Sequence, residues 1–114
     1  HLGHDRLVGL VHEARVGLLA SAGMGEMDVE GRALVIVELK VSYRAEATHG
    51  QRLRIAVAPG ELRSRSCDLL YRVTDADSGG LVAMARTGLV VIDPATRRPT
   101  PVPDSLRELL TAVA

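Results

Sequence analysis

Three of the four histidines and a glutamate lie close together at the start of the chain. His1, His4, His12 and Glu13 are residue types that can bind metal ions or transfer protons. The spacing of His4 and His12 differs from the i, i+4 pair with which a helix binds zinc, and no cysteine lies near them. We therefore expect no metal site and ask whether this segment performs acid–base chemistry.

The single cysteine, Cys67, follows Arg65 by two positions. A neighbouring cation can activate a thiol, but the sequence shows no histidine partner for it. We therefore expect Cys67 to be a packing thiol. One cysteine cannot form an internal disulfide, which excludes a secreted disulfide scaffold and makes the cytoplasm the expected location.

Arginine supplies all the cationic side chains except Lys40. Its planar guanidinium suits phosphate and carboxylate recognition, although a genome-wide preference for arginine would give the same composition. The formal net charge is zero, and Tyr43 and Tyr71 are the only aromatic residues apart from the histidines. The sequence therefore lacks the overall positive field and the stacking surfaces typical of nucleic-acid-binding proteins.

An amphipathic helix from Asp5 to about Ala22 is predicted to position the first histidines. Its apolar residues recur at spacings of three and four: Leu7, Leu10, Val11, Ala14 and Leu18. Further apolar residues beside that stripe predict burial on more than one side. We expect Asp5 to cap the helix start, and Gly23 and Gly25 to end the helix.

The start of such a helix can itself take part in catalysis. Its unpaired backbone N–H groups and partial positive charge can stabilise a developing oxyanion, whereas capping by Asp5 and water is the plain structural alternative. Glu13 is an acid within the mostly apolar helix, where burial would raise its pKa and suit it to proton transfer. Pairing of Glu13 with an arginine across a subunit interface is the alternative.

Four strands are predicted after the helix, over residues 33–44, 53–65, 68–74 and 81–92. In the first, alternation places Val35 and Val37 on one face with Leu39, and Glu38 and Lys40 on the other. Proline cannot donate a ladder hydrogen bond, so Pro59 indicates an edge or a bulge in the second strand. The fourth strand is almost continuously apolar, which is typical of a central or interface strand. Short connections predict an antiparallel meander.

A short helix beginning near Asp104, with Leu106, Leu109 and Leu110 facing inward, is predicted to end the chain. No apolar run approaches the roughly 20 residues that span a bilayer. At 114 residues the chain has room for one modest core. The element order therefore predicts one α+β domain in which a sheet covers a long helix.

Two motifs near the start of the chain resemble those of hotdog-fold acyl-CoA thioesterases of the 4-hydroxybenzoyl-CoA thioesterase type. His1-Leu2-Gly3-His4 occupies the place of the family's turn before the central helix, and His12-Glu13-Ala14-Arg15 stands at the spacing of its Glu-Glu-Ala-Arg-like box. Later features follow in the family's order: Tyr43-Arg44 at a strand end, Gly50-Gln51-x-Leu53 and Arg65-Ser66-Cys67 at strand starts, an acidic turn with glycines, and Pro101-x-Pro103. Gly3 and His4 replace asparagines that are common in the family.

The resemblance implies a hotdog fold, an antiparallel sheet wrapped around one long central helix with a short C-terminal helix. It implies a single domain over residues 1–114 whose first strand would lie upstream of residue 1. The implied activity is hydrolysis of an acyl-CoA thioester to free acid and CoA, with no cofactor apart from the CoA of the substrate. The implied assembly is a homodimer joined edge to edge, or a tetramer, with no nucleic-acid or membrane partner.

The resemblance also implies roles for particular residues. The backbone N–H near His4 would polarise the thioester carbonyl. Glu13 is the visible candidate for base or nucleophile, because the family's usual aspartate would lie upstream of His1. The remaining implied substrate contacts are His1, Gly3, Asp5, Arg63, Arg65 and Ser66. The last three would meet CoA, whereas a solvated sheet face is the alternative for the arginines.

Two other functions are compatible with this fold. A non-catalytic hotdog protein could bind acyl groups or act as an assembly scaffold. A hydratase acting on acyl thioesters would need an Asp–His pair at a helix start, which is not recognisable in the sequence. The scarcity of aromatic residues favours an aliphatic acyl pocket.

Overall fold

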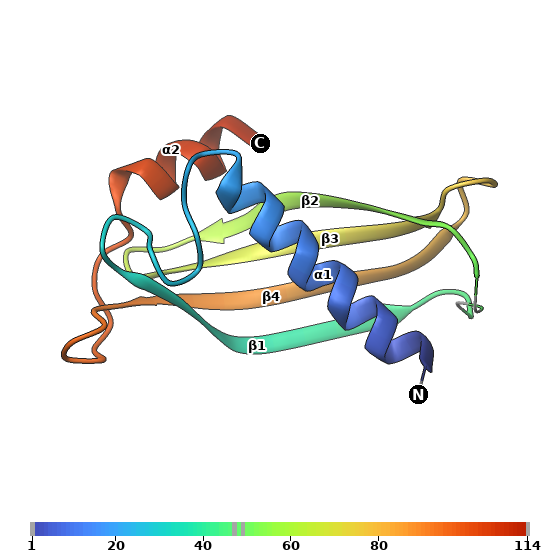
Figure 1. Ribbon diagram of the computed structural model, residues 1–114, viewed down its shortest axis with the longest axis horizontal. Helices are drawn as coiled ribbons and strands as arrows, with labels where there is room; N and C mark the ends of the chain where they lie inside the picture. The colour runs from blue at the N-terminus through green and yellow to red at the C-terminus, as the bar shows by residue number, and fades with distance from the viewer. Residues whose placement is uncertain (1, 47, 49, 114) are drawn as a thin grey trace.

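The computed structural model describes residues 2–46, 48 and 50–113. These residues form four antiparallel strands and two helices, and the long helix crosses the strands diagonally (Figure 1). The elements are α1 (Leu2–Ala20), β1 (Ala33–Tyr43), β2 (Leu53–Leu62), β3 (Ser66–Asp75), β4 (Leu81–Ile92) and α2 (Asp104–Val113). The predicted α+β hotdog architecture is confirmed.

The strand order in the sheet is β1-β4-β3-β2. The predicted meander holds for the last three strands, but β1 pairs with β4 and not with β2. The connection between β1 and β2 is long enough to cross the end of the sheet. Strand β1 therefore need not pair with β2, which follows it in the sequence. The apolar β4 is consequently a central strand, as predicted, and β1 and β2 are the two edges.

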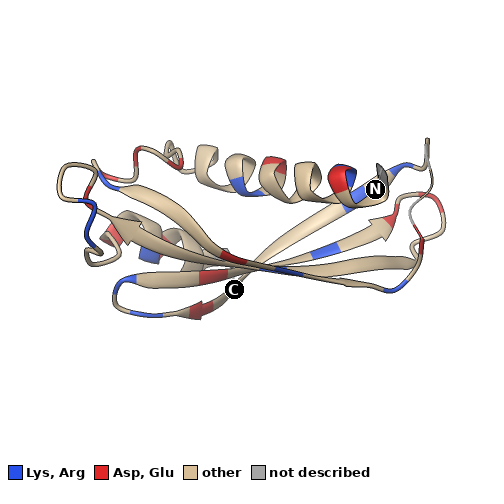
Figure 2. Cartoon of the chain, turned by 90° about the horizontal axis from the view of Figure 1, so that it is seen from below, with Lys and Arg blue, Asp and Glu red and all other residues tan. Residues whose placement is uncertain are grey.

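Helix α1 lies on one side of the sheet (Figure 2), which we call the helix face. Leu7, Val11 and Leu19 are fully buried against the strands. Val16, in contrast, is 42% exposed. The predicted burial on more than one side is therefore wrong, because the described chain covers only one side of the helix.

The start of α1 also differs from the prediction. The helix begins at Leu2, so Gly3, His4 and Asp5 all lie in its first turn and Asp5 is not the N-cap. An acidic side chain in the first turn is still favoured by the positive end of the helix dipole. The helix ends near Gly23, whose positive φ of 75° is the conformation expected of a C-terminal glycine.

A β-bulge divides β1 between Ile36 and Glu38. The extra residue, Val37, shifts the alternation, so Val37 lies beside Glu38 on the sheet surface opposite α1, which we call the open face. Val35 pairs with Val90 and also belongs to the open face. The prediction that Val35 and Val37 share a face with Leu39 is therefore wrong.

One main core cluster joins α1, the helix face and α2. Leu106 and Leu110 of α2 are buried in it together with Leu19, as predicted for the C-terminal helix. The predicted irregularity at Pro59 is confirmed, since the pairing of β2 with β3 shifts between Pro59 and Leu62. Within the described residues, no helix is long and apolar enough to cross a membrane.

Candidate active site

The first turn of α1 is held against the end of β1. His4 Nδ1 and the Tyr43 hydroxyl are 2.6 Å apart, and both side chains are exposed. Partial burial, and secondly the negative charge of Asp5, raise the pKa of Tyr43. The backbone N–H groups of Gly3 and His4 are among those at a helix start that have no acceptor within the helix. This cluster therefore presents hydrogen-bond donors, an imidazole and a carboxylate at one exposed position.

An apolar groove runs along α1 beside β1. Its volume is about 330 Å³, and its lining residues are Val8, Val11, His12, Arg15, Ile36, Leu39 and Thr87. At 100° per residue, His4, Val8, Val11 and Arg15 fall on nearly the same face of the helix. The groove therefore continues from the His4 turn, and its side chains suit an aliphatic group.

A buried polar network closes the far end of the groove. Arg15 is 2% exposed, and its Nε donates to Glu26 Oε2 at 2.7 Å. Arg15 also contacts the Tyr71 hydroxyl and His12 Nδ1, and the Tyr71 hydroxyl bonds Thr87 Oγ1 at 2.8 Å. Burial alone would lower the pKa of Arg15, but the bonds to Glu26 and Tyr71 outweigh it and the pKa is raised. The guanidinium is therefore a charged, fixed part of the core.

The structure does not bring Glu13 to this groove. Glu13 follows His4 by nine positions, which is half a turn beyond two full turns and places it on the opposite side of α1. Glu13 is exposed there. A catalytic role for Glu13 would require a site formed with another molecule, and the role stays a prediction. His1 lies outside the described residues.

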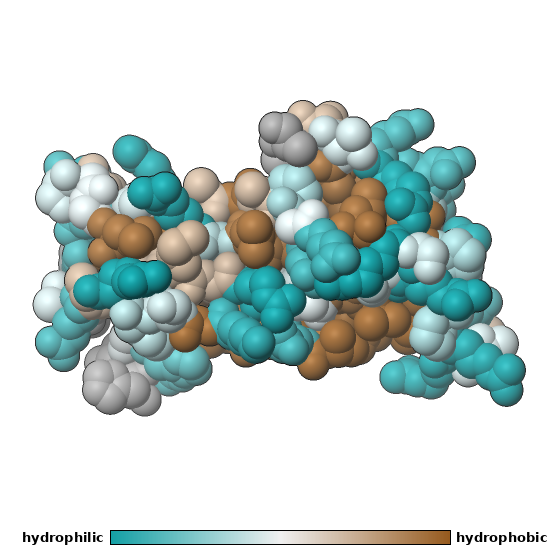
Figure 3. Space-filling view, turned by 180° about the vertical axis from the view of Figure 1, so that it is seen from behind, coloured by the Kyte–Doolittle hydropathy of each residue, from teal (hydrophilic) through white to brown (hydrophobic). Residues whose placement is uncertain are grey.

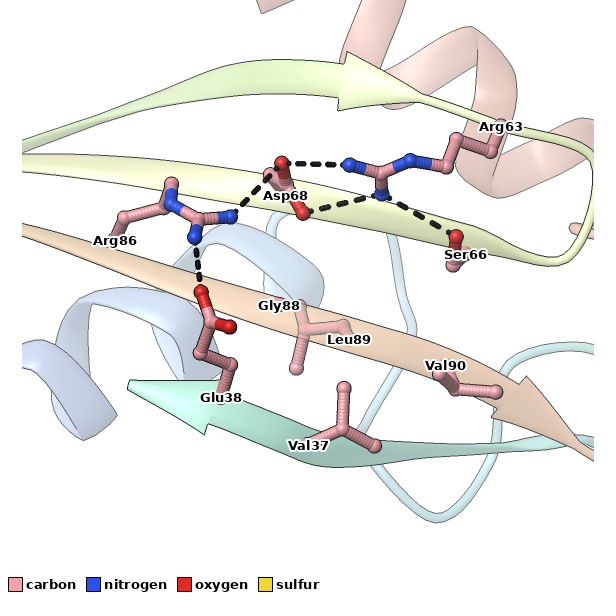
Figure 4. A pocket seen from close by; sticks show the side chains of 9 residues that line it. All are labelled: Val37, Glu38, Arg63, Ser66, Asp68, Arg86, Gly88, Leu89 and Val90. Atoms are coloured by element: carbon pink, nitrogen blue, oxygen red, sulfur yellow. Dashed lines mark hydrogen bonds and ion pairs between the residues drawn. The ribbon is translucent and has the colours of Figure 1, made fainter. Parts of the chain in front are cut away.

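Arg63 and Ser66 come together on the open face, as Figure 4 shows. Arg63 bonds both carboxylate oxygens of Asp68, at 3.2 and 3.0 Å, and reaches Ser66 Oγ at 3.3 Å. Arg86 joins Asp68 to Glu38 of β1. The hydrogen bond from Arg63 is the main cause that lowers the pKa of Asp68. These charges join β1, β3 and β4 to the segment that follows β2, around a depression of about 370 Å³.

The Arg63 cluster is far from the start of α1. Tyr43 pairs with Ala83, whereas Ser66 pairs with Val90, seven residues along β4 and so roughly 24 Å away. The cluster also lies on the other face of the sheet. Within one chain, Arg63 and Ser66 are therefore not neighbours of His4. Arg65 is exposed, and its carbonyl accepts from Val91 at 3.0 Å.

Sequence reasoning missed Tyr43 as a site residue, although its place at a strand end was visible. It correctly treated Cys67 as a packing thiol. Cys67 is 1% exposed, and burial raises its pKa to about 11, which keeps the thiol protonated at neutral pH. Within the part of the chain that the structure describes, no group of histidine, cysteine or acidic side chains could hold a metal ion.

Comparison with known proteins gives a family. Residues 1–110 match the family described as the thioesterase-like superfamily. Among curated proteins, none matches this sequence.

Solved structures with the same fold include a probable thioesterase, YbaW, from Escherichia coli. It is 27% identical, with 96% of this chain and 83% of that chain covered and a TM-score of 0.79. A 1,4-dihydroxy-2-naphthoyl-CoA thioesterase from Synechocystis is 24% identical, with 94% and 80% covered and a TM-score of 0.83. A DHNA-CoA thioesterase from Staphylococcus aureus is 17% identical, with 96% and 76% covered and a TM-score of 0.82.

Proposed function

This chain belongs to the thioesterase-like superfamily, and we propose that it hydrolyses an acyl-CoA thioester to a free acid and CoA. Thioesterase activity in general is what the family and its structural neighbours support. The observation that carries the finer proposal is the groove that leads away from the His4 turn at the start of α1. The thioester carbonyl would lie at that turn and the acyl chain along Val8 and Val11.

The first turn of α1 would polarise the carbonyl. Its free N–H groups, near Gly3 and His4, would donate to the carbonyl oxygen as negative charge develops on it. Water adds to the carbonyl carbon, the carbon–sulfur bond breaks, and the CoA thiolate leaves and takes up a proton. Tyr43 holds the His4 ring beside this position.

A carboxylate is needed to remove the proton from the attacking water. Of the acids near the His4 turn, Asp5 is close enough to Tyr43 to influence its titration, whereas Glu13 is on the other side of α1. Asp5 is therefore our candidate within one chain. Glu13 could act as the base only in a site that a second molecule shares. An acid upstream of His1 could act only where the chain extends beyond that residue.

A second copy of the chain would complete the groove. The backbone N–H of Arg44 donates to the carbonyl of Val82. Backbone N–H groups alternate in direction along an edge strand, so those of Ser42 and Lys40 also face β4. The N–H groups of Leu39, Val41 and Tyr43 point away from β4, toward the open edge of the sheet. Ile36 is 44% exposed and Leu39 is 39% exposed beside this unpaired edge. We propose that two copies pair along β1, and that each supplies a wall to the other's groove.

Release of free thiol from a panel of saturated acyl-CoAs tests the activity. Val8→Trp fills the groove, and we expect it to lower kcat/KM by about tenfold or more, as a loss of about 1.4 kcal/mol of binding would. Val16→Trp, on an exposed part of α1, is the matched control and should change kcat/KM less than twofold. Equal effects of the two substitutions would remove the groove from the acyl site.

The acid is tested by Asp5→Asn beside Glu13→Gln. General base catalysis typically contributes about 10²–10⁴ in rate, so Asp5→Asn should lower kcat by at least about 10² while Glu13→Gln leaves it unchanged. The reverse pattern would move the chemistry to Glu13 and a shared site. Binding of acyl-CoA without turnover by the wild type would instead favour the non-catalytic acyl-binding protein.

A further inference from the structure

We propose that the groove beside α1 selects an acyl chain that carries a neutral oxygen, a hydroxyl or a keto group, near its far end. The end of the groove away from the His4 turn is made by His12, Arg15, Tyr71 and Thr87, and we call it the polar end. These residues belong to α1, β3 and β4 of one chain, so the polar end does not depend on pairing along β1. The inference rests on the proposed function for the place of the thioester, and it adds the class of acyl group.

The hydroxyls of Tyr71 and Thr87 leave one proton without an acceptor. Tyr71 Oη and Thr87 Oγ1 are 2.8 Å apart, and both residues are 1% exposed. Two hydroxyl groups carry two protons, and the bond between them uses one, whichever group donates. Arg15 can only donate to Tyr71, so it cannot accept the second proton. The residues that the structure describes form no other hydrogen bond with these hydroxyls, and a buried donor in this state favours a ligand that accepts.

Arg15 and His12 add further donors to the polar end. The guanidinium has five N–H groups, of which three have partners within the described chain, on Glu26, Tyr71 and His12. Because Arg15 donates to His12 Nδ1 at 3.1 Å, the ring accepts there and carries its proton on Nε2. Arg15, His12 and Thr87 all line the groove. An oxygen that accepts hydrogen bonds is therefore the complementary group.

The charge at the polar end is already neutralised. Arg15 Nε is 2.7 Å from Glu26 Oε2, and the side chain of Glu26 is 22% exposed. A carboxylate on the acyl chain would bring a second negative charge close to Glu26, and partial burial strengthens that repulsion. Burial of an unpaired charge also costs far more than burial of a hydrogen-bonded hydroxyl. The geometry therefore favours a neutral oxygen over a carboxylate.

The distance from the His4 turn sets the position of the oxygen on the acyl chain. Thr87 lies four residues along β4 from Ala83, the partner of Tyr43, which corresponds to roughly 13 Å. The rise along α1 from His4 to Arg15 is similar, at roughly 16 Å. An extended chain advances roughly 1.2 Å per bond, as the backbone does with its three bonds in ~3.6 Å per residue. The oxygen should therefore lie about ten bonds or slightly more from the thioester carbonyl.

The test compares decanoyl-CoA with 10-hydroxydecanoyl-CoA and 9-oxodecanoyl-CoA by release of free thiol. We expect the wild type to prefer at least one of the oxygenated substrates by about tenfold in kcat/KM, equivalent to about 1.4 kcal/mol, which is what one hydrogen bond contributes. The CoA monothioester of decanedioic acid, which ends in a carboxylate, should be a poorer substrate than decanoyl-CoA. No preference for either neutral oxygen, or a preference for the carboxylate, would overturn the proposal.

Chain length provides a second comparison. The oxygen of 6-hydroxyhexanoyl-CoA would stop short of the polar end, so this substrate should show no preference over hexanoyl-CoA. An equal preference for the hydroxyl at both chain lengths would mean that the oxygen is recognised elsewhere, and would overturn the assignment to Arg15 and Thr87.

Substitutions at Thr87 test the donor itself. Thr87→Val removes the hydroxyl with little change of shape, and should reduce the preference for the oxygenated substrates to about one. Thr87→Ser keeps the hydroxyl and should keep the preference, which separates loss of the donor from a disturbed core. Thr74→Val is the matched control: Thr74 follows Tyr71 by three positions and so lies on the open face, where hydrophilic groups separate apolar patches (Figure 3). A preference that survives in Thr87→Val, or that is lost equally in Thr87→Ser, would overturn the proposal.

A binding measurement separates this inference from the proposed function. Decanoic acid and 10-hydroxydecanoic acid contain no thioester, and calorimetry measures the binding of each to the protein. Tighter binding of the hydroxy acid that Thr87→Val abolishes supports the polar end even if no thioester is hydrolysed. Hydrolysis of the acyl-CoAs without any preference, together with equal binding of the two acids, would overturn the inference and leave the enzyme assignment standing.

Discussion

Arg15 connects helix and sheet through one buried side chain. The guanidinium reaches Glu26 in the loop after α1 and the Tyr71 hydroxyl on the sheet. A charge so deeply buried is tolerated only when it is paired and hydrogen-bonded. The network therefore fixes the position of α1 over the strands, and with it the place of the groove.

Replacement of Arg15 tests that conclusion. Arg15→Met keeps much of the apolar volume but removes the guanidinium that pairs with Glu26, which leaves His12 at 3.7 Å as the nearest remaining basic group. The side chain of Glu26 is 22% exposed, so water can solvate the unpaired carboxylate in part and limit the cost of losing the arginine. We therefore expect a loss of about 2–3 kcal/mol in the free energy of unfolding, measured by urea denaturation. A variant as stable as the wild type would show that the network positions the helix without stabilising it.

Asp68 provides a pH-dependent contribution to stability. Its pKa is lower in the folded protein than in the unfolded chain, chiefly because Arg63 hydrogen-bonds the carboxylate. The contribution is therefore fully present above the ordinary carboxyl pKa of about 4 and is lost as the pH falls through the folded value. Asp68→Asn should lower the free energy of unfolding by about 1.5–3 kcal/mol at pH 7. The difference from wild type should shrink on acidification, and a constant difference between pH 7 and pH 3 would contradict this account.

At the scale of elements, periodicity predicted the helices and strands because each buries one face. It failed in β1 because a bulge depends on the partner strand: Gly88 leaves room for both Val37 and Glu38 on the open face, and nothing in β1 itself marks the extra residue. The start of α1 was misplaced because Asp5 is as favourable within the first turn as at the cap. The His4–Tyr43 contact joins residues 39 positions apart, and local patterns carry no such information.

Helix α1 has an exposed side with two glycines, Gly9 and Gly17, where a Cβ would meet nothing within 4 Å. Alanine loses less backbone entropy than glycine on forming a helix. Gly17→Ala should therefore raise the free energy of unfolding by about 0.5–1 kcal/mol and the Tm by a few degrees. Gly23→Ala is the control, because its φ of 75° makes any Cβ strained and should lower Tm. A lower Tm for Gly17→Ala would indicate that this side of α1 packs closely against another molecule.

At the scale of the molecule, the sheet separates two kinds of surface. The helix face carries the groove and the His4 turn, and the open face carries the charge network of Arg63, Asp68, Arg86 and Glu38. Composition predicted an aliphatic core and arginines suited to phosphate. The positions of Arg63 and Ser66, far from His4, could not be predicted, because they depend on the direction and register of β3 relative to β1.

Pairing along β1 can be tested by a substitution that removes one donor. The N–H of Val41 points away from β4, so Val41→Pro should remove a hydrogen bond between chains and keep those between β1 and β4. The cost within one chain is the packing of the partly buried Val41 side chain against the core. We expect wild type to elute at twice the mass of the chain in size-exclusion chromatography with light scattering, and Val41→Pro to elute as a folded monomer. Lys40→Pro is the control: the N–H of Lys40 faces β4, and the loss of that hydrogen bond should lower Tm.

Because each copy would lose the wall that its partner adds to the groove, Val41→Pro should also lower kcat/KM for acyl-CoA by about tenfold, as a loss of about 1.4 kcal/mol of binding would. A dimer that persists in Val41→Pro would place the contact elsewhere, and a fully active monomer would show that one chain completes the site.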